Sequence, residues 1–159
     1  MSKAGLKAAL LYGSKLKSFN SISDAKEFYF TFYNRLKDEF IDLCKENEIL
    51  FTNYSVESLK DLEKWYFELL EEDKFESIGI SREEFEQCMG VYFAEVVVQN
   101  NKDASLIVEE FPFVPGKYNM VVNKGLASMT FFGLCVDWYS RTGNKRRTLL
   151  FREYNKYFS

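Results

Sequence analysis

The sequence predicts one α+β domain in which about five helices pack with a small antiparallel β-hairpin. Apolar residues recur at steps of three or four along most of the chain, which is typical of amphipathic helices. After residue 100 they alternate instead around a Pro-Gly pair, which is typical of two paired strands. The length of 159 residues suits a single domain, and the 47% hydrophobic and 18% aromatic content excludes an intrinsically disordered chain.

Residues 1–20 form a basic segment that contains four lysines and no acidic residue. Its leucines are loosely spaced, and Gly5 and Gly13 weaken any helix that it forms. We therefore expect a weakly amphipathic segment that is either mobile or docked on a single domain formed by residues 21–159.

A long helix is expected over residues 23–48. Ser23 is its expected N-cap, and Asp24 places a negative charge in the first turn, where the helix dipole favours it. The expected core stripe of this helix consists of Phe28, Phe32, Leu36, Phe40 and Leu43.

Two further helices are expected over residues 55–73 and 81–99. The first should end at its run of three acids, because acids oppose the dipole at a helix C-terminus. The second begins with the capping-box pair Ser81 and Glu84. The expected core positions are Leu59, Leu62, Tyr66 and Leu69 in the first of these helices and Phe85, Met89, Tyr92, Val96 and Gln99 in the second.

A type II turn at residues 114–117 separates two expected strands, because proline and glycine occupy its two central positions. The strands are expected over residues 104–111 and 117–123. An isolated hairpin is marginally stable in water, so this one must pack on helices. One face of the second strand carries Tyr118, Met120 and Val122.

The chain after residue 125 allows two interpretations. Its apolar residues step by three or four, which favours a fourth helix, but residues 130–132 could instead form a third strand. Helix or strand over residues 126–136 therefore stays open. A last helix is expected from about Lys145 to Phe158. The apolar positions of the possible fourth helix are Leu126, Met129, Phe132, Val136 and Tyr139.

Several kinds of chemistry are excluded by what the chain lacks. It has no histidine, which removes most zinc sites and every nucleophile–histidine pair. Glycine-rich phosphate loops and the nucleophile elbow are also missing. We therefore expect no enzymatic activity, no cofactor and no metal. No apolar run is long enough to span a membrane, so no membrane contact is expected.

The three cysteines are widely separated and odd in number. A disulfide framework is not expected from Cys44, Cys88 and Cys135. Free cysteines are usually buried, so we expect three buried thiols in a cytoplasmic protein.

The charge of −3 is distributed unevenly along the chain. Both ends are basic and residues 21–110 are strongly acidic, with acids outnumbering bases three to one over residues 57–95. These acids either lie on solvated helix faces or form a docking surface for a basic partner, since acidic surfaces speed association with basic proteins. The expected docking surface comprises Glu57, Asp61, Glu68, Glu71, Glu72, Glu83 and Glu86.

Glu95 is unusual because it interrupts the apolar run of residues 91–98. Its carboxylate either points into a cleft or is buried and satisfied by hydrogen bonds, as a buried acid must be. In the first case Tyr92, Glu95 and Tyr118 form a small-molecule site between the third helix and the hairpin.

The loop of residues 141–147 carries four basic side chains. It could contact phosphate or nucleic acid, but we favour an intramolecular role opposite the acidic middle of the chain. A nucleic-acid partner is therefore not expected.

The segment Gly90-Val-Tyr-Phe-Ala-Glu-Val96 is followed by a turn and a hairpin that ends near Tyr118 to Val122. This arrangement resembles small uncharacterised bacterial α+β domains, some of which are associated with immunity proteins of toxin systems. The resemblance covers about residues 81–123, with Ala94 where the pattern usually has glycine. It implies a non-enzymatic role in binding a partner and shows no site.

Together these observations predict a non-enzymatic cytosolic domain that binds a protein with a basic surface. An immunity-type protein that masks a basic toxin through the acidic helical surface is the specific form of this prediction. The alternative is a small-molecule-binding or sensor domain with its site near Tyr92 and Glu95.

Overall fold

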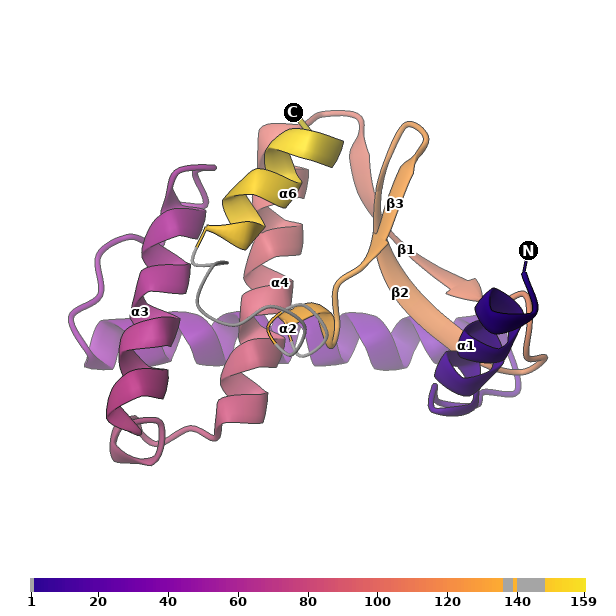
Figure 1. Ribbon diagram of the computed structural model, residues 1–159, viewed down its shortest axis with the longest axis horizontal. Coiled ribbons are helices and arrows are strands. Elements are labelled where there is room, and N and C mark those ends of the chain that lie inside the picture. Colours follow the sequence, from indigo (N-terminus) through magenta and orange to yellow (C-terminus); the bar gives the residue numbers. More distant parts are fainter. Residues whose placement is uncertain (1, 136–138, 140–147) are drawn as a thin grey trace.

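The computed structural model describes residues 2–135, 139 and 148–159. Within these residues, five α-helices and a three-stranded antiparallel sheet form one α+β domain, which confirms the predicted fold class. Helix α2 (Ile22–Glu46) runs along the long axis of the molecule (Figure 1). Helices α3 (Ser58–Glu72) and α4 (Arg82–Asn100) cross it, and the sheet lies beside α4.

The N-cap of helix α2 lies two residues earlier than expected. The side-chain oxygen of Ser21 accepts a hydrogen bond from the backbone N–H of Asp24 at 3.2 Å, so Ser21 is the N-cap and the prediction of Ser23 is wrong. Ser21 has the extended backbone of a capping residue, whereas Ser23 already lies inside the helix.

The core face of α2 also differs from the predicted stripe in its first half. Leu36, Phe40 and Leu43 are buried as predicted, but Tyr29 and Tyr33 take the core positions expected for Phe28 and Phe32. The tyrosine hydroxyls find buried acceptors, since Tyr29 donates to the backbone oxygen of Tyr118 at 2.6 Å and Tyr33 donates to the carboxylate of Glu95. Phe28 and Phe32 are left half-buried beside the core.

Helix α4 is the centre of the core. Its predicted N-cap is confirmed, because the side chain of Ser81 accepts from the backbone N–H of Glu84 at 3.1 Å. Four of its five predicted core positions, Phe85, Met89, Tyr92 and Val96, are buried as expected, but Gln99 is exposed. The burial also extends beyond the predicted face, since nearly every residue from Phe85 to Val97 is buried. Helix α4 contacts α2, α3 and two strands, and a helix enclosed in this way buries side chains around its whole circumference.

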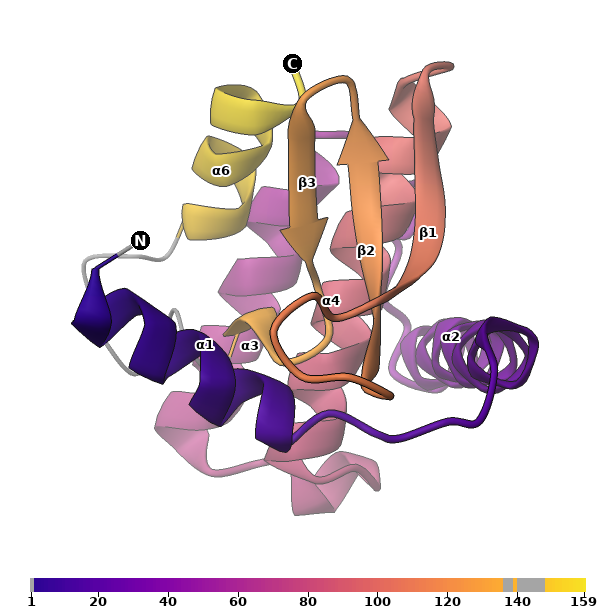
Figure 2. The same ribbon diagram turned by 90° about the vertical axis from the view of Figure 1, so that its right-hand side faces the viewer.

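The sheet consists of β1 (Ala104–Glu110), β2 (Tyr118–Lys124) and β3 (Ala127–Thr130) in that order, and Figure 2 shows it face on. The predicted hairpin is confirmed, with Val108 paired to Met120. Its turn is also confirmed, because the N–H of Lys117 donates to the oxygen of Val114 and Gly116 has a φ of 79°.

The segment after residue 125 is a strand where a helix was the first interpretation. Residues Ala127–Thr130 pair with β2, and Gly125, with a φ of 59°, makes the tight turn between the two strands. A helix could not begin at Leu126, which lies fully exposed in that turn. Helical backbone appears at Leu134, and residues 136–138 of the predicted helix lie outside the described part of the chain.

The remaining helices lie at the two ends of the chain. Helix α1 (Lys3–Ser14) lies against the connection between β1 and β2, where Tyr12 contacts Phe111 with ring centroids 5.4 Å apart. Helix α6 (Leu149–Tyr157) packs on α3. A short 3-10 helix, Glu76–Ile78, connects α3 to α4.

Candidate functional site

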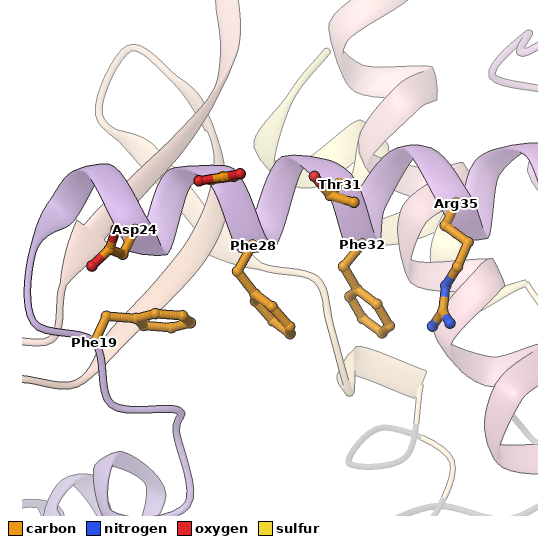
Figure 3. Close-up of a pocket in the computed structure, with 7 residues that line it drawn as sticks. Phe19, Asp24, Phe28, Thr31, Phe32 and Arg35 are labelled. Atoms are coloured by element: carbon orange, nitrogen blue, oxygen red, sulfur yellow. The ribbon is translucent and has the colours of Figure 1, made fainter.

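An open groove of about 670 Å³ runs along the first half of α2 (Figure 3). Phe28, Phe32 and Arg35 project from the same side of the helix, in a row with Phe19 from the segment before it. We call this feature the α2 groove. It is lined by Phe19, Asp24, Glu27, Phe28, Thr31, Phe32 and Arg35.

Helical geometry explains why these residue types line one groove. Side chains four residues apart lie on the same helix face. Asp24, Phe28 and Phe32 therefore form one ridge, and Glu27, Thr31 and Arg35 form its neighbour. The groove thus has an aromatic floor with carboxylates at one end and a guanidinium at the other.

The aromatic floor is continuous. The ring centroids of Phe19 and Phe28 are 5.5 Å apart, and those of Phe28 and Phe32 are 5.9 Å apart in nearly parallel planes. Phe132, which follows β3, extends the row at 5.2 Å from Phe32. All four rings are half-buried. Groups of large aromatic side chains left accessible on a folded surface often mark binding sites.

The charged side chains around the floor differ in their ion pairs and cation–π contacts. Arg35 lies over the Phe32 ring at 5.1 Å and forms a 3.8 Å ion pair with Glu39. Lys17 lies over the Phe28 ring at 4.0 Å. Among the described residues, no ion pair involves Asp24 or Glu27. The groove therefore combines aromatic faces, two of which carry cations, with two solvated carboxylates.

The sequence analysis missed this groove because it placed Phe28 and Phe32 in the core. A signal was nevertheless present. Residues 28–33 carry five aromatic side chains in six positions, and one face of a helix cannot bury all of them.

The acidic surface predicted on α3 and α4 is only partly assembled. Glu57, Asp61, Glu68, Glu71, Glu72 and Glu83 are exposed. Glu57 pairs with Lys60 at 3.1 Å, and Glu72 pairs with Lys74 at 2.7 Å. Exposed pairs of this kind contribute little to stability, so this surface mainly carries negative charge.

Glu86 does not belong to that surface. It is 4% exposed and accepts hydrogen bonds from the hydroxyl of Tyr66 at 2.6 Å and from the Nε of Arg82 at 2.9 Å. A carboxylate with both a buried hydroxyl and a guanidinium as partners is satisfied within the fold. Its role is therefore structural.

The structure does not bring Tyr92, Glu95 and Tyr118 together in one cavity. The Tyr92 hydroxyl lies 2.6 Å from the Ser58 side-chain oxygen, on the α3 side of α4, and the space beside it is about 10 Å³. Tyr118 lies in β2, under the ring of Phe19. A space of about 10 Å³ holds at most one water molecule, so a small-molecule site has no room here.

Glu95 is a satisfied buried acid. It accepts hydrogen bonds from Tyr33, from Lys37 at 2.9 Å and from Gln99 at 3.1 Å. Burial raises the pKa of this carboxyl, but the three hydrogen bonds outweigh that effect and hold the pKa below its usual value. Of the two interpretations of Glu95, its contacts therefore support the structural one.

A second buried acid, Glu63, was not singled out from the sequence. It is 0% exposed on α3 and accepts from the Tyr139 hydroxyl at 2.7 Å and from the backbone N–H of Leu150 at 2.6 Å. The second bond caps the N-terminus of α6 with a carboxylate, where the helix dipole favours negative charge. Burial raises the pKa of Glu63 to about 7, although these hydrogen bonds act in the opposite direction.

Other predictions concern features that lie elsewhere. All three cysteines are free and buried, as expected. The described residues contain no cluster of His, Cys, Asp and Glu side chains that could hold a metal ion. None of the described helices is both long and apolar enough to cross a membrane. The basic loop at residues 141–147 lies outside the described part of the chain.

The fold and the groove define a small single-domain α+β protein with an open aromatic groove on its longest helix. Residues 18–158 match the family described as "Uncharacterised protein YwmA", and the chain belongs to this family. A protein of Bacillus subtilis strain 168 with the same description is 29% identical over 138 residues, which cover 87% of each chain. No solved structure is significantly similar to the chain.

Proposed function

We propose that this chain is a non-catalytic binding protein whose partner is a protein with a basic surface. The α2 groove is the observation that carries this proposal. Three half-buried phenylalanine rings form an accessible floor next to Asp24 and Glu27, two carboxylates without an ion pair among the described residues. An apolar side chain of the partner would pack on the floor while a neighbouring cation approached the carboxylates.

The acidic surface of α3 supports the same proposal in a second way. Its exposed acids lie outside the groove, so they would not touch a segment bound there. They would instead raise the rate at which a basic partner arrives. An immunity-type role, in which the partner is a basic toxin, is the specific form of this proposal and rests on the resemblance of residues 81–123. A cytoplasmic location fits the three free thiols.

The test uses a short labelled peptide of alternating lysine and leucine, with a glutamate–leucine peptide as the comparison. We expect the lysine peptide to bind, to weaken with added salt, and to perturb the backbone NMR signals of residues 19–35. Replacing Phe28 and Phe32 together by alanine should abolish this binding. The matched control is Tyr157→Ala, which removes an aromatic ring that is 44% exposed on α6.

Three results would contradict the proposal. They are no binding of the lysine peptide, equal binding of the glutamate peptide, and NMR perturbations confined to other surfaces. If a toxin partner is found, co-production of the chain should restore growth to cells that make the toxin, and the Phe28/Phe32 double variant should fail to do so.

A further inference from the structure

The position of Lys17 indicates what kind of side chain the α2 groove recognises. Its ammonium lies over the face of the Phe28 ring at 4.0 Å, well within the distance of a cation–π contact. Arg35 makes the same type of contact with Phe32 at 5.1 Å. Each of these two ring faces is therefore already covered by a cation of the chain itself.

We infer that the partner presents a lysine or arginine side chain to the face of Phe28, an inference that rests on the proposed function. In the free protein, the Lys17 side chain holds this position. The partner's cation would displace Lys17 and also approach the carboxylate of Asp24, which lies one helical turn before Phe28. Lys17 is thus an internal competitor that lowers the affinity of the groove.

The surroundings of Lys17 allow such an exchange without unfolding. Its backbone is held, because the N–H of Tyr118 donates to the oxygen of Lys17 at 3.2 Å and Ser18 forms a β-bridge with Lys117. Its side chain is exposed and forms no ion pair with the described residues. Displacing the ammonium therefore costs one exposed cation–π contact, a small amount of free energy.

Arg35 is a less suitable position for exchange. It is tied to Glu39 by an ion pair at 3.8 Å as well as to the Phe32 ring. A partner cation at Phe32 would have to break both contacts. A cation of the partner therefore gains the most binding free energy at the face of Phe28, close to the unpaired acids Asp24 and Glu27.

The experiment measures the affinity of the lysine–leucine peptide and of an arginine–leucine version for six proteins. These are the wild type, the single variants Lys17→Ala, Lys26→Ala and Phe28→Leu, and the two double variants that combine Phe28→Leu with either lysine substitution. Lys26 is an exposed lysine on α2 whose ammonium lies over no aromatic ring of the described residues, so its variant measures the effect of removing one positive charge nearby. Lys17→Ala removes the competitor, so it should raise the affinity for the peptide about three-fold more than Lys26→Ala does.

The double variants separate competition for the ring from the effect of one positive charge. Phe28→Leu keeps an apolar side chain but removes the ring face, so affinity should fall, and in this background Lys17→Ala and Lys26→Ala should change affinity by the same factor. Equal effects of the two lysine variants in the wild-type background would overturn this inference and leave the proposed function intact. Failure of every protein to bind either peptide would overturn both.

Discussion

The backbone oxygen of Phe131 lies only 2.2 Å from the position that a Cβ atom on Gly90 would occupy. The chain leaving β3 therefore crosses α4 at this glycine, and no larger residue could stand there without a shift of backbone. Gly90 opens the segment that resembles the bacterial α+β domains, so the contact gives a physical reason for glycine at that point of the pattern. This contact between Phe131 and Gly90 joins the chain that leaves the sheet to helix α4.

Gly90→Ala is expected to destabilise the protein by about 1–3 kcal/mol, the usual cost of overpacking a core. Helix propensity alone predicts the opposite sign, a gain of about 1 kcal/mol for alanine over glycine. Urea unfolding measures the difference directly. Gln87→Ala, on the less buried side of the same helix, is the control. A stabilised Gly90→Ala protein would mean that the chain after β3 does not pack against α4 as described.

Much of this fold could be predicted because its local signals are strong. The caps at Ser81 and the turn at Pro115 and Gly116 depend on residues close in sequence, and both were predicted correctly. The helix expected from Leu126 failed because the apolar spacing there fits either a helix or a strand. Pairing with β2, which the local pattern does not contain, decides the outcome.

The candidate site was harder to predict for a related reason. The run of residues 28–33 contains two aromatic pairs four residues apart, Phe28 with Phe32 and Tyr29 with Tyr33. Periodicity cannot choose between them, because both pairs have the helical spacing. The choice is made by acceptors far away in sequence, the Glu95 carboxylate and the Tyr118 backbone oxygen, which take the tyrosine hydroxyls and leave the phenylalanines at the surface.

The hydroxyl of Tyr33 should therefore matter more than that of Tyr29. Tyr33→Phe removes a bond to a charged acceptor and should cost about 2 kcal/mol, whereas Tyr29→Phe removes a bond to a neutral carbonyl and should cost about 1 kcal/mol. Chemical denaturation at neutral pH checks both values. A cost for Tyr33→Phe no greater than that for Tyr29→Phe would be inconsistent with an ionised Glu95.

The pH dependence of stability gives a second check on the hydrogen bond between Tyr33 and Glu95. The lowered pKa of Glu95 means that its carboxylate contributes stability above the usual pKa of glutamate, and that this contribution is lost as the pH falls through the folded-state value. The difference in unfolding free energy between wild type and Tyr33→Phe should accordingly shrink in acid. A difference that stays constant down to pH values below that pKa would contradict the assignment.

Glu63 should produce the opposite pH dependence. Its folded-state pKa, raised from 4.5 to about 7, means that the native state keeps a proton which the unfolded state releases between these values. Stability is therefore lost as the pH rises through this interval, by about 3 kcal/mol in total. Glu63→Gln keeps an acceptor for the N–H of Leu150 but cannot ionise, so its stability should lose this dependence.

Two further variants serve as controls for the Glu63→Gln experiment. Glu68→Gln alters an exposed acid on the same helix and should retain the wild-type pH dependence. Glu63→Ala leaves the Leu150 N–H and the Tyr139 hydroxyl without their acceptor and should be destabilised at every pH. If Glu63→Gln follows the wild-type curve between pH 4.5 and 7, the titrating group is a different one.

The exposed acids of α3 should affect how fast a basic partner binds rather than how long it stays. Charge reversal at Glu68, Glu71 and Glu72 removes long-range attraction, and these residues do not line the α2 groove. The association rate of the lysine–leucine peptide should therefore fall several-fold at low salt and approach the wild-type value at about 0.5 M salt, where the Debye length is only a few ångströms. The dissociation rate of the peptide should not change.

Stopped-flow fluorescence measures both rates, with Phe32→Ala as the contrasting variant that should speed dissociation. Faster dissociation after charge reversal would instead mean that the peptide touches the acidic surface of α3, and the binding site would then have to be moved from the α2 groove to that surface.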